Sequence, residues 1–463
     1  LTPGAQTLLQ RLSVCVGGFD LDATFALAEG IDADGFDLLR ELVAKSLVER
    51  YEVNANTRYR LLEMIRQHAA ERLDLVGEAP TIRDRHADHY ADRLVMLIAD
   101  ARSDDEYDVL EMIGVETPNV AAGLRWWLAT ERVADVLACF DRMPYFDLFA
   151  LPAVALDELT AVAEAAIELP DTEHLPGFSQ ACVLVSFLAF MNGHIDDYRR
   201  LHALANARGT TIAGAITDSI AAMFDGDTVR SVERAQVGVD LARAHGDEAQ
   251  LAWLLGQLTI MEAILEHSTG DHTGAAAAHA DEALTVADRV PGTIVRLYPL
   301  LATVEAYKAV DVDRALWAAE EMSRIDRTQR RWWATIAINS AANARAGVGD
   351  VIGEIGQWRT AIADFDEHDE RFMLAMLLAT VSDSLVAVDA RIAIELAAIA
   401  ESGAIAPAPT FTVQPALGRL TDERPDDVAT ARARAAPLSY REAVDRVLEV
   451  LDLVLAEHPP VDD

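Results

Sequence analysis

Apolar positions in the first eighty residues follow two spacings in succession. They recur every three or four residues up to position 44, as in amphipathic helices, and then alternate with polar residues, as in strands. The segment Asn54-Ala55-Asn56 separates the two alternating runs and predicts a hairpin turn. The predicted elements are helices at residues 5–16, 23–28, 34–44 and 63–73 and strands at residues 46–53 and 57–61. Three helices, a two-stranded wing and a following helix predict a winged-helix domain over residues 1–80.

From about residue 150 onward, the apolar pattern becomes repetitive. Short Gly or Asp breaks separate pairs of helix-length patterns, such as residues 248–265 followed by residues 273–290. The breaks lie at Gly193, Gly226, Gly270, Asp311, Gly349 and Asp389. This period, with Ala at the packing positions of the second helix, predicts hairpins like tetratricopeptide repeats (TPRs) over residues 151–403.

The remaining segments complete a mainly α fold. Residues 81–150 predict a helical bridge, whereas the polar, Pro-rich stretch at residues 406–427 predicts a loop. A last amphipathic helix opens near Leu438, so residues 404–463 are expected to be a linker and a C-terminal helical cap. We therefore predict a small winged-helix domain followed by an α-solenoid of TPR-like helical hairpins.

Charge argues against nucleic acid and lipid as partners. The 463 residues carry a formal net charge of -37, which repels phosphate backbones and anionic membranes. Residues 1–80 contain 8 Lys and Arg against 13 Asp and Glu, and residues 34–41 offer acids where a recognition helix needs basic or amide side chains. We expect no direct nucleic-acid binding by this chain and no membrane association. A basic protein partner held by the acidic surface stays an open alternative.

The three cysteines indicate a reducing compartment. Cys15, Cys139 and Cys182 are far apart in apolar surroundings, which predicts buried thiols and no disulfide framework. No apolar run reaches the length of a membrane span, and no secretory signal opens the chain. We expect a cytoplasmic protein, and the start at Leu1 suggests a piece of a longer chain.

Five separated blocks of sequence carry a family resemblance. They read RLSVCVGGFDLDAT, LLRELVAKSLVER, RYRLLEMIRQHAAERL, RDRHADHYADRL and VETPNVAAGLRWWL. Together they span roughly residues 5–130 and resemble the segment that follows the nucleotide-binding domain in bacterial STAND-type signalling ATPases. These include the large LuxR-type and the adenylate-cyclase-linked transcriptional regulators.

The resemblance implies a partner domain upstream. In that family the winged helix packs against the ATPase core and reports its nucleotide state to the repeats behind. ATP or ADP is therefore expected in an upstream nucleotide-binding domain, and no cofactor is expected in this chain, which has no phosphate-binding G-x-x-x-x-G-K-[ST] loop. The family's nucleotide-contacting Met-His-Asp triplet corresponds to Leu61-Leu62-Glu63, which lacks the His. The candidate interface to the ATPase domain is Leu62, Glu63 and Arg66.

The repeats contain one basic and aromatic island in an otherwise acidic chain. An Arg and Trp groove could bind an anionic small molecule or peptide through ion pairs and cation–π contacts. The candidate residues for this groove are Arg327, Arg330, Arg331, Trp332 and Trp333. The alternative is a packed helix whose arginines pair with the abundant acids.

Two further pairs of residues on the bridge have structural explanations. His86 and His89 share a helix face, but a third metal ligand is missing nearby, which favours an ordinary helix surface or an interdomain contact. Trp126 and Trp127 point about 100° apart on a helix, so one is expected in the core and the other against a neighbouring helix.

These features favour a regulatory protein over an enzyme. No nucleophile elbow, zinc-protease motif or dinucleotide-binding fingerprint occurs, so no catalytic and no metal residues are predicted. We expect a non-catalytic sensor region of a STAND-type transcriptional regulator, which relays the binding of a protein, peptide or small-molecule inducer on the repeats to the nucleotide-binding domain. The alternative is a standalone acidic scaffold for a basic protein, and an unrecognised helical enzyme is a third possibility.

Overall fold

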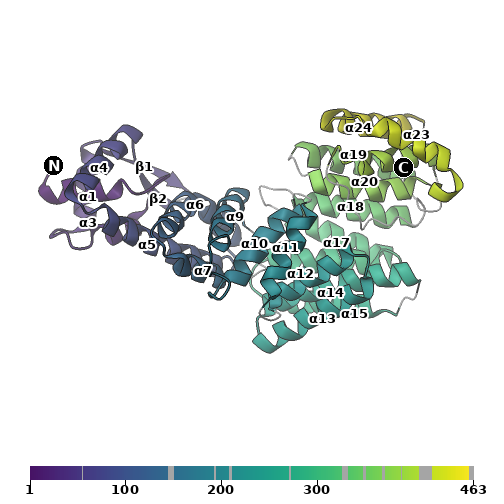
Figure 1. Cartoon of the computed structure of the whole chain (residues 1–463), viewed down its shortest axis with the longest axis horizontal. Coiled ribbons are helices and arrows are strands. Elements are labelled where there is room, and N and C mark those ends of the chain that lie inside the picture. Colours follow the sequence, from purple (N-terminus) through teal and green to yellow (C-terminus); the bar gives the residue numbers. More distant parts are fainter. Residues whose placement is uncertain are drawn as a thin grey trace. The chain divides into compact units, whose positions relative to one another are not determined.

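The computed structural model confirms a mainly α protein with one small sheet (Figure 1). It describes residues 1–54, 56–143, 151–191, 194–207, 211–270, 273–325, 332–347, 351–367, 371–386, 388–405 and 420–457. The chain forms two compact units, Leu1–Ala181 and Cys182–Asp463. The finer division at residues 80, 150 and 403 stays a prediction.

The first unit begins with the predicted winged helix. Its helices are α1 (Pro3–Leu12), α2 (Leu21–Ala28), α3 (Gly35–Ala44) and α4 (Glu63–Val76), and its strands are β1 (Val48–Val53) and β2 (Asn56–Leu61). Side chains of Thr2, Asp20 and Asp34 cap α1, α2 and α3 by accepting hydrogen bonds from backbone amides of the first turn. The helices enclose a core of fully buried leucines, which includes Leu8, Leu12, Leu27, Leu39 and Leu42.

A short segment of the loop before α2 pairs with the hairpin next to β2. β1 and β2 pair antiparallel, and Phe19 exchanges backbone hydrogen bonds of 2.8 Å with Tyr59 on the free edge of β2. The loop reaches this edge through Gly17 and Gly18, whose φ values are 80° and 109°. A side chain at Gly18 would also collide with the Tyr51 hydroxyl, so both the backbone conformation and the space require glycine there.

A helical hairpin follows the winged helix and packs against it. It consists of α5 (Ala79–Asp100) and α6 (Glu106–Ala129), which lie side by side and are followed by α7 (Val133–Asp141) and α9 (Ala153–Ile167). The two helices approach closely at Gly123 of α6, where an added Cβ would lie 2.8 Å from the Ala87 Cα. The boundary between the two units falls within α10 (Phe178–Met191).

The second unit is a succession of helices that pack pairwise along the chain. They are α11 (Ile195–Asn206), α12 (Ile212–Phe224), α13 (Thr228–His245), α14 (Glu248–Thr269), α15 (Ala275–Ala287), η1 (Ile294–Arg296), α16 (Leu297–Tyr307), α17 (Val312–Ile325), α18 (Trp332–Gly347), α19 (Val351–Glu367), α20 (Arg371–Leu385) and α21 (Ala390–Glu401). Beyond its immediate neighbours, α16 also contacts α14 and α18, as expected of stacked hairpins. Four of the predicted breaks lie at helix ends: Gly226 and Gly270 follow helices with positive φ, Asp311 precedes α17, and Asp389 caps α21. The other two, Gly193 and Gly349, lie outside the described residues.

The prediction of a loop as far as residue 427 was wrong at its end. Helix α23 (Pro425–Ala435) begins inside that stretch, and α24 (Tyr440–Glu457) follows as predicted. Pro425 occupies the first turn, where its missing N–H costs nothing, and Asp426 and Asp427 face the positive end of the helix dipole. The polar residues that looked like a helix stop are therefore a helix start.

Candidate functional site

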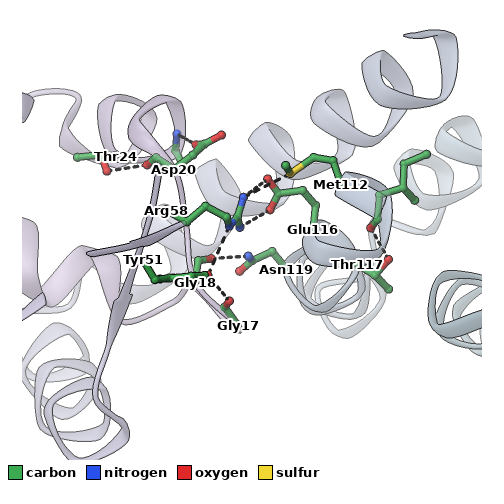
Figure 2. A network of polar contacts seen from close by, with 12 residues as sticks. Gly17, Gly18, Asp20, Thr24, Tyr51, Arg58, Met112, Glu116, Thr117 and Asn119 are labelled. Carbon is green, nitrogen blue, oxygen red and sulfur yellow. Dashed lines mark hydrogen bonds and ion pairs between the residues drawn. The ribbon is translucent and has the colours of Figure 1, made fainter. Parts of the chain in front are cut away.

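A buried ion pair joins the wing to the helical hairpin. The Arg58 guanidinium on β2 donates to both carboxylate oxygens of Glu116 on α6, with Nη1–Oε1 2.7 Å and Nη2–Oε2 2.8 Å (Figure 2). Each side chain is only 1% exposed. Burial acts to lower the pKa of Arg58, but the hydrogen bonds and charge of Glu116 outweigh it and raise that pKa above its usual value. The pair is therefore a fixed connection between two elements that lie 58 positions apart in sequence.

Strand pairing aims Arg58 at α6. Arg58 lies opposite Tyr51 in the hairpin register, and its Nε is 3.4 Å from the Tyr51 hydroxyl. That hydroxyl donates to the Gly17 carbonyl at 3.2 Å, so the glycine loop, the wing and the arginine support one another. On the α6 side, Met112 Sδ lies 3.8 Å from Arg58 Nη1 and covers the pair.

Asn119, one turn further along α6, holds the glycine loop. Its Oδ1 accepts from the Val16 amide at 2.6 Å, and its Nδ2 donates to the Gly18 carbonyl at 2.8 Å. These two backbone groups set the orientation of the amide, which lets the neighbouring histidine be assigned. His86 Nε2 lies 3.2 Å from the Asn119 Oδ1, so in the neutral ring Nε2 carries the proton and donates it.

His86 stays neutral because it is buried. Its side chain is 3% exposed, and desolvation lowers its pKa to about 4 although the hydrogen bond to Asn119 acts in the opposite direction. The predicted position on a helix surface was therefore wrong for His86, which is buried beside the contact between Asn119 and the glycine loop. The described residues contain no cluster of His, Cys, Asp and Glu able to hold a metal ion.

The tip of the wing also reaches α6. The Asn54 amide donates to the Glu111 carboxylate at 2.6 Å. Glu111, Glu116 and Asn119 are spaced along one side of α6, and each contacts a different part of the winged-helix domain. We call these contacts, together with His86, the wing joint.

The predicted interface residues lie at the start of α4. Leu62 is 46% exposed, and Glu63 accepts a 2.8 Å hydrogen bond from Arg66 Nη2. The hydrogen bonds from Arg66 and Gln67 lower the pKa of Glu63 to about 2. Arg66 also donates to the Ser13 carbonyl at 3.4 Å, which ties this turn to the end of α1. Their role as an interface to another domain stays a prediction.

The predicted Arg and Trp groove cannot be placed. Arg327, Arg330 and Arg331 lie outside the described residues, and so do the side chains of Trp332 and Trp333 at the start of α18. The adjacent Arg324 on α17 pairs with Glu320 and Glu321 of its own helix.

The tandem tryptophans behave as predicted. Trp127 is 5% exposed in the core, whereas the Trp126 indole reaches α5 and donates to Asp84 at 2.8 Å. An arginine lies over each ring, Arg83 over Trp126 and Arg132 over Trp127.

Arg58, Glu116 and Asn119 were not predicted as functional residues. The strand gave no signal, because Arg58 occupies the same face of β2 as the exposed Arg60 and carries no feature that marks it as buried. In α6 the polar run Glu116-Thr117-Pro118-Asn119 interrupts a largely apolar helix, and such a run in a helix interior marks buried polar contacts. This signal by itself does not name the partner.

Comparisons with known proteins agree with this architecture. The family described as a winged helix-turn-helix domain matches residues 1–74. Proteins of Mycobacterium tuberculosis and Mycobacterium bovis, named as HTH-type transcriptional regulators, are 37% identical over 140 residues, which is 30% of this chain and 16% of theirs. An uncharacterized Mycobacterium tuberculosis protein is 40% identical over 88 residues, or 18% of this chain and 22% of its own length.

Among solved structures, the chain resembles a STAND protein with a tetratricopeptide repeat sensor from Pyrococcus horikoshii. The TM-score is 0.52 at 13% identity, over 98% of this chain and 66% of that one. At this identity the likeness concerns the fold. The aligned segment covers only a small part of the mycobacterial regulators, so their whole activity is not transferred. The chain thus has a winged helix-turn-helix domain followed by helical repeats, and it is similar in sequence to HTH-type regulators and in fold to a STAND protein.

Proposed function

We propose that this chain is a non-catalytic regulatory region of a STAND-type regulator. In this proposal the helical repeats bind a protein, peptide or small-molecule inducer, and the winged helix passes the signal to a nucleotide-binding domain elsewhere in a longer protein. The similarity to HTH-type regulators and the fold of a STAND protein with a repeat sensor support it.

The wing joint is the observation that carries the proposal. A wing used for reading DNA has to be free, whereas here its tip and its arginine are bound by Glu111 and Glu116 of α6. Both contacts bring the winged helix and the hairpin into one fixed arrangement, so a displacement of the hairpin has to move the wing or break the joint. A relay needs a two-state element, which a ligand biases only through its different affinity for the two states, and in this proposal the joint is formed in one state and broken in the other.

The test compares two charge pairs of the same wing in the full-length protein. The double variant Arg58→Met/Glu116→Leu replaces the buried pair with apolar side chains, and Arg60→Met/Glu49→Leu replaces an exposed pair of 3.0 Å. We expect the first variant to change nucleotide turnover or assembly state and the second to leave both unchanged. If both folded variants show the nucleotide turnover and the assembly state of the wild type, a relay through the wing joint is refuted.

The net charge of -37 favours a second candidate, a scaffold for a basic protein. In that case the buried-pair variant behaves like wild type, and the chain captures one basic partner with an affinity that falls steeply as salt is added.

A further inference from the structure

A cleft opens beside the wing joint. It has a volume of about 370 Å³ and lies between the winged helix and the helical hairpin. The N-terminal end of α2 and strand β2 form one side, and α5 and α6 form the other. The polar residues that line it are Asp20, Asp22, Asn56, Thr57, Arg58, Arg93 and Asp108. This volume falls within the range of small-molecule sites, at its lower end.

Arg93 on α5 is the first notable group of this cleft. It makes no hydrogen bond or ion pair with any residue that the structure describes, and its Nε is covered by protein. This contrasts with Arg58 on the opposite side of the cleft, whose guanidinium is bound by both carboxylate oxygens of Glu116. A partly buried guanidinium without a partner is unfavourable, because its covered Nε has lost water and gained no hydrogen bond in return. A carboxylate is the group that best matches such a fork of donors.

Acids from the opposite walls complete the cleft. Asp22 belongs to the first turn of α2 and Asp108 to the first turn of α6, and both are exposed. Neither forms an ion pair with Arg93 within 4.0 Å among the described residues. Asp20 is already engaged, since it caps α2 through the Ala23 amide at 2.8 Å. The cleft therefore presents one free cation and two free carboxylates that are too far apart to neutralise one another directly.

We propose that this cleft binds a small zwitterion of the free α-amino-acid class. The carboxylate of the ligand would pair with Arg93, and its ammonium group would pair with both Asp22 and Asp108. A simple anion is disfavoured by the two aspartates, and a simple cation is disfavoured by Arg93, so only a ligand with both charges satisfies both sides. The apolar wall of Leu97, Val109 and Met112 leaves room for an aliphatic side chain.

Such a ligand would stabilise the docked wing. Its carboxylate partner comes from the hairpin, whereas Asp22 comes from the winged helix, so the site is complete only when the two pack together. The inference stands without the proposed relay function, because it concerns binding by this chain alone.

The experiment is a binding screen with the standard free amino acids, each at about 10 mM, by saturation-transfer NMR followed by titration. Propionate and propylamine serve as probes that carry only one of the two charges. We expect at least one amino acid to bind saturably and both single-charge probes to bind about tenfold more weakly or not at all. Arg93→Gln and, separately, Asp108→Asn should each weaken binding by about tenfold or more.

Arg125→Gln is the matched control, since Arg125 is an arginine of α6 that pairs with Glu158 away from the cleft. It should bind like wild type. Asp108 is exposed, so the Asn variant tests the site even if Arg93→Gln disturbs folding. The absence of saturable binding by every amino acid, or binding that survives both cleft variants, would overturn the assignment.

Discussion

Both charges of the Arg58–Glu116 pair are withdrawn from water, so each depends on the other. Loss of one partner leaves an unpaired buried charge, which costs about 3–5 kcal/mol. We expect Arg58→Met and Glu116→Leu, made separately, each to lower the free energy of unfolding of the first unit by about this amount. Urea titrations followed by circular dichroism measure it.

Arg60 on the same strand provides the control for this measurement. Its pair with Glu49 is 58% and 43% exposed, so Arg60→Met should cost less than about 1 kcal/mol. The double variant Arg58→Met/Glu116→Leu should cost less than either single change, because it leaves no charge buried alone. If the single variants unfold at the wild-type urea concentration, the pair does not stabilise the joint.

His86 predicts a dependence of stability on pH. Its pKa is about 4 in the folded protein, against 6.5 as the ordinary value, so between these values the unfolded chain binds more protons. The stabilisation is complete above pH 6.5 and is lost as the pH falls towards 4, by up to about 3 kcal/mol. We expect unfolding free energies measured across this window to fall less steeply in His86→Gln than in wild type.

Because carboxylates titrate in part of the same window, the informative quantity is the difference between variant and wild type. His68→Gln, at an exposed position of α4, is the matched change. Its pH profile should run parallel to that of wild type, and a parallel profile for His86→Gln would contradict the prediction.

At the scale of elements, α6 organises the first unit because its faces meet different neighbours. One side carries Glu111, Glu116 and Asn119 towards the winged helix, and Gly123 allows the close approach to α5. Pro118 lies inside the helix, and the Thr117 hydroxyl donates to the Ile113 carbonyl at 2.7 Å in the same turn. Helix α6 nevertheless continues to Ala129, past a residue that usually interrupts a helix.

Two glycines of α6 allow a matched test of this packing. A Cβ at Gly123 would lie 2.8 Å from the Ala87 backbone, whereas a Cβ at Gly114 would meet Pro152 at an ordinary 3.7 Å. Replacing a helix-interior Gly with Ala normally stabilises by about 1 kcal/mol. We therefore expect Gly114→Ala to raise the melting temperature, and Gly123→Ala to lower it because overpacking costs about 1–3 kcal/mol. Equal shifts in calorimetry would show that α5 and α6 yield at this crossing.

For the whole molecule, the net charge of -37 bears on partners more than on the fold. A winged helix suggests DNA, but the acidic field and the occupied wing both oppose it. We expect fluorescence anisotropy with a labelled duplex to show a dissociation constant weaker than about 100 μM at physiological salt. Micromolar binding that weakens steeply with salt would instead reveal a phosphate-binding surface.

The sequence by itself determined the class of fold and its order along the chain. Helical spacing, the alternation at residues 46–61 and the Gly and Asp breaks are local patterns, and a residue's near neighbours suffice to produce them. The same local logic failed at Pro425, because proline and aspartate occur both where helices stop and where they start.

Only the tertiary structure decided the wing joint and the cleft. Arg58 and Glu116 lie 58 positions apart, Val16 and Asn119 lie 103 apart, and nothing in either local pattern names its partner. A buried charge looks like a surface charge in sequence, since both are simply Arg or Glu within an amphipathic element. What distinguishes them is whether packing removes water and supplies the opposite charge, and that depends on how α6 meets the wing rather than on the residues beside each one.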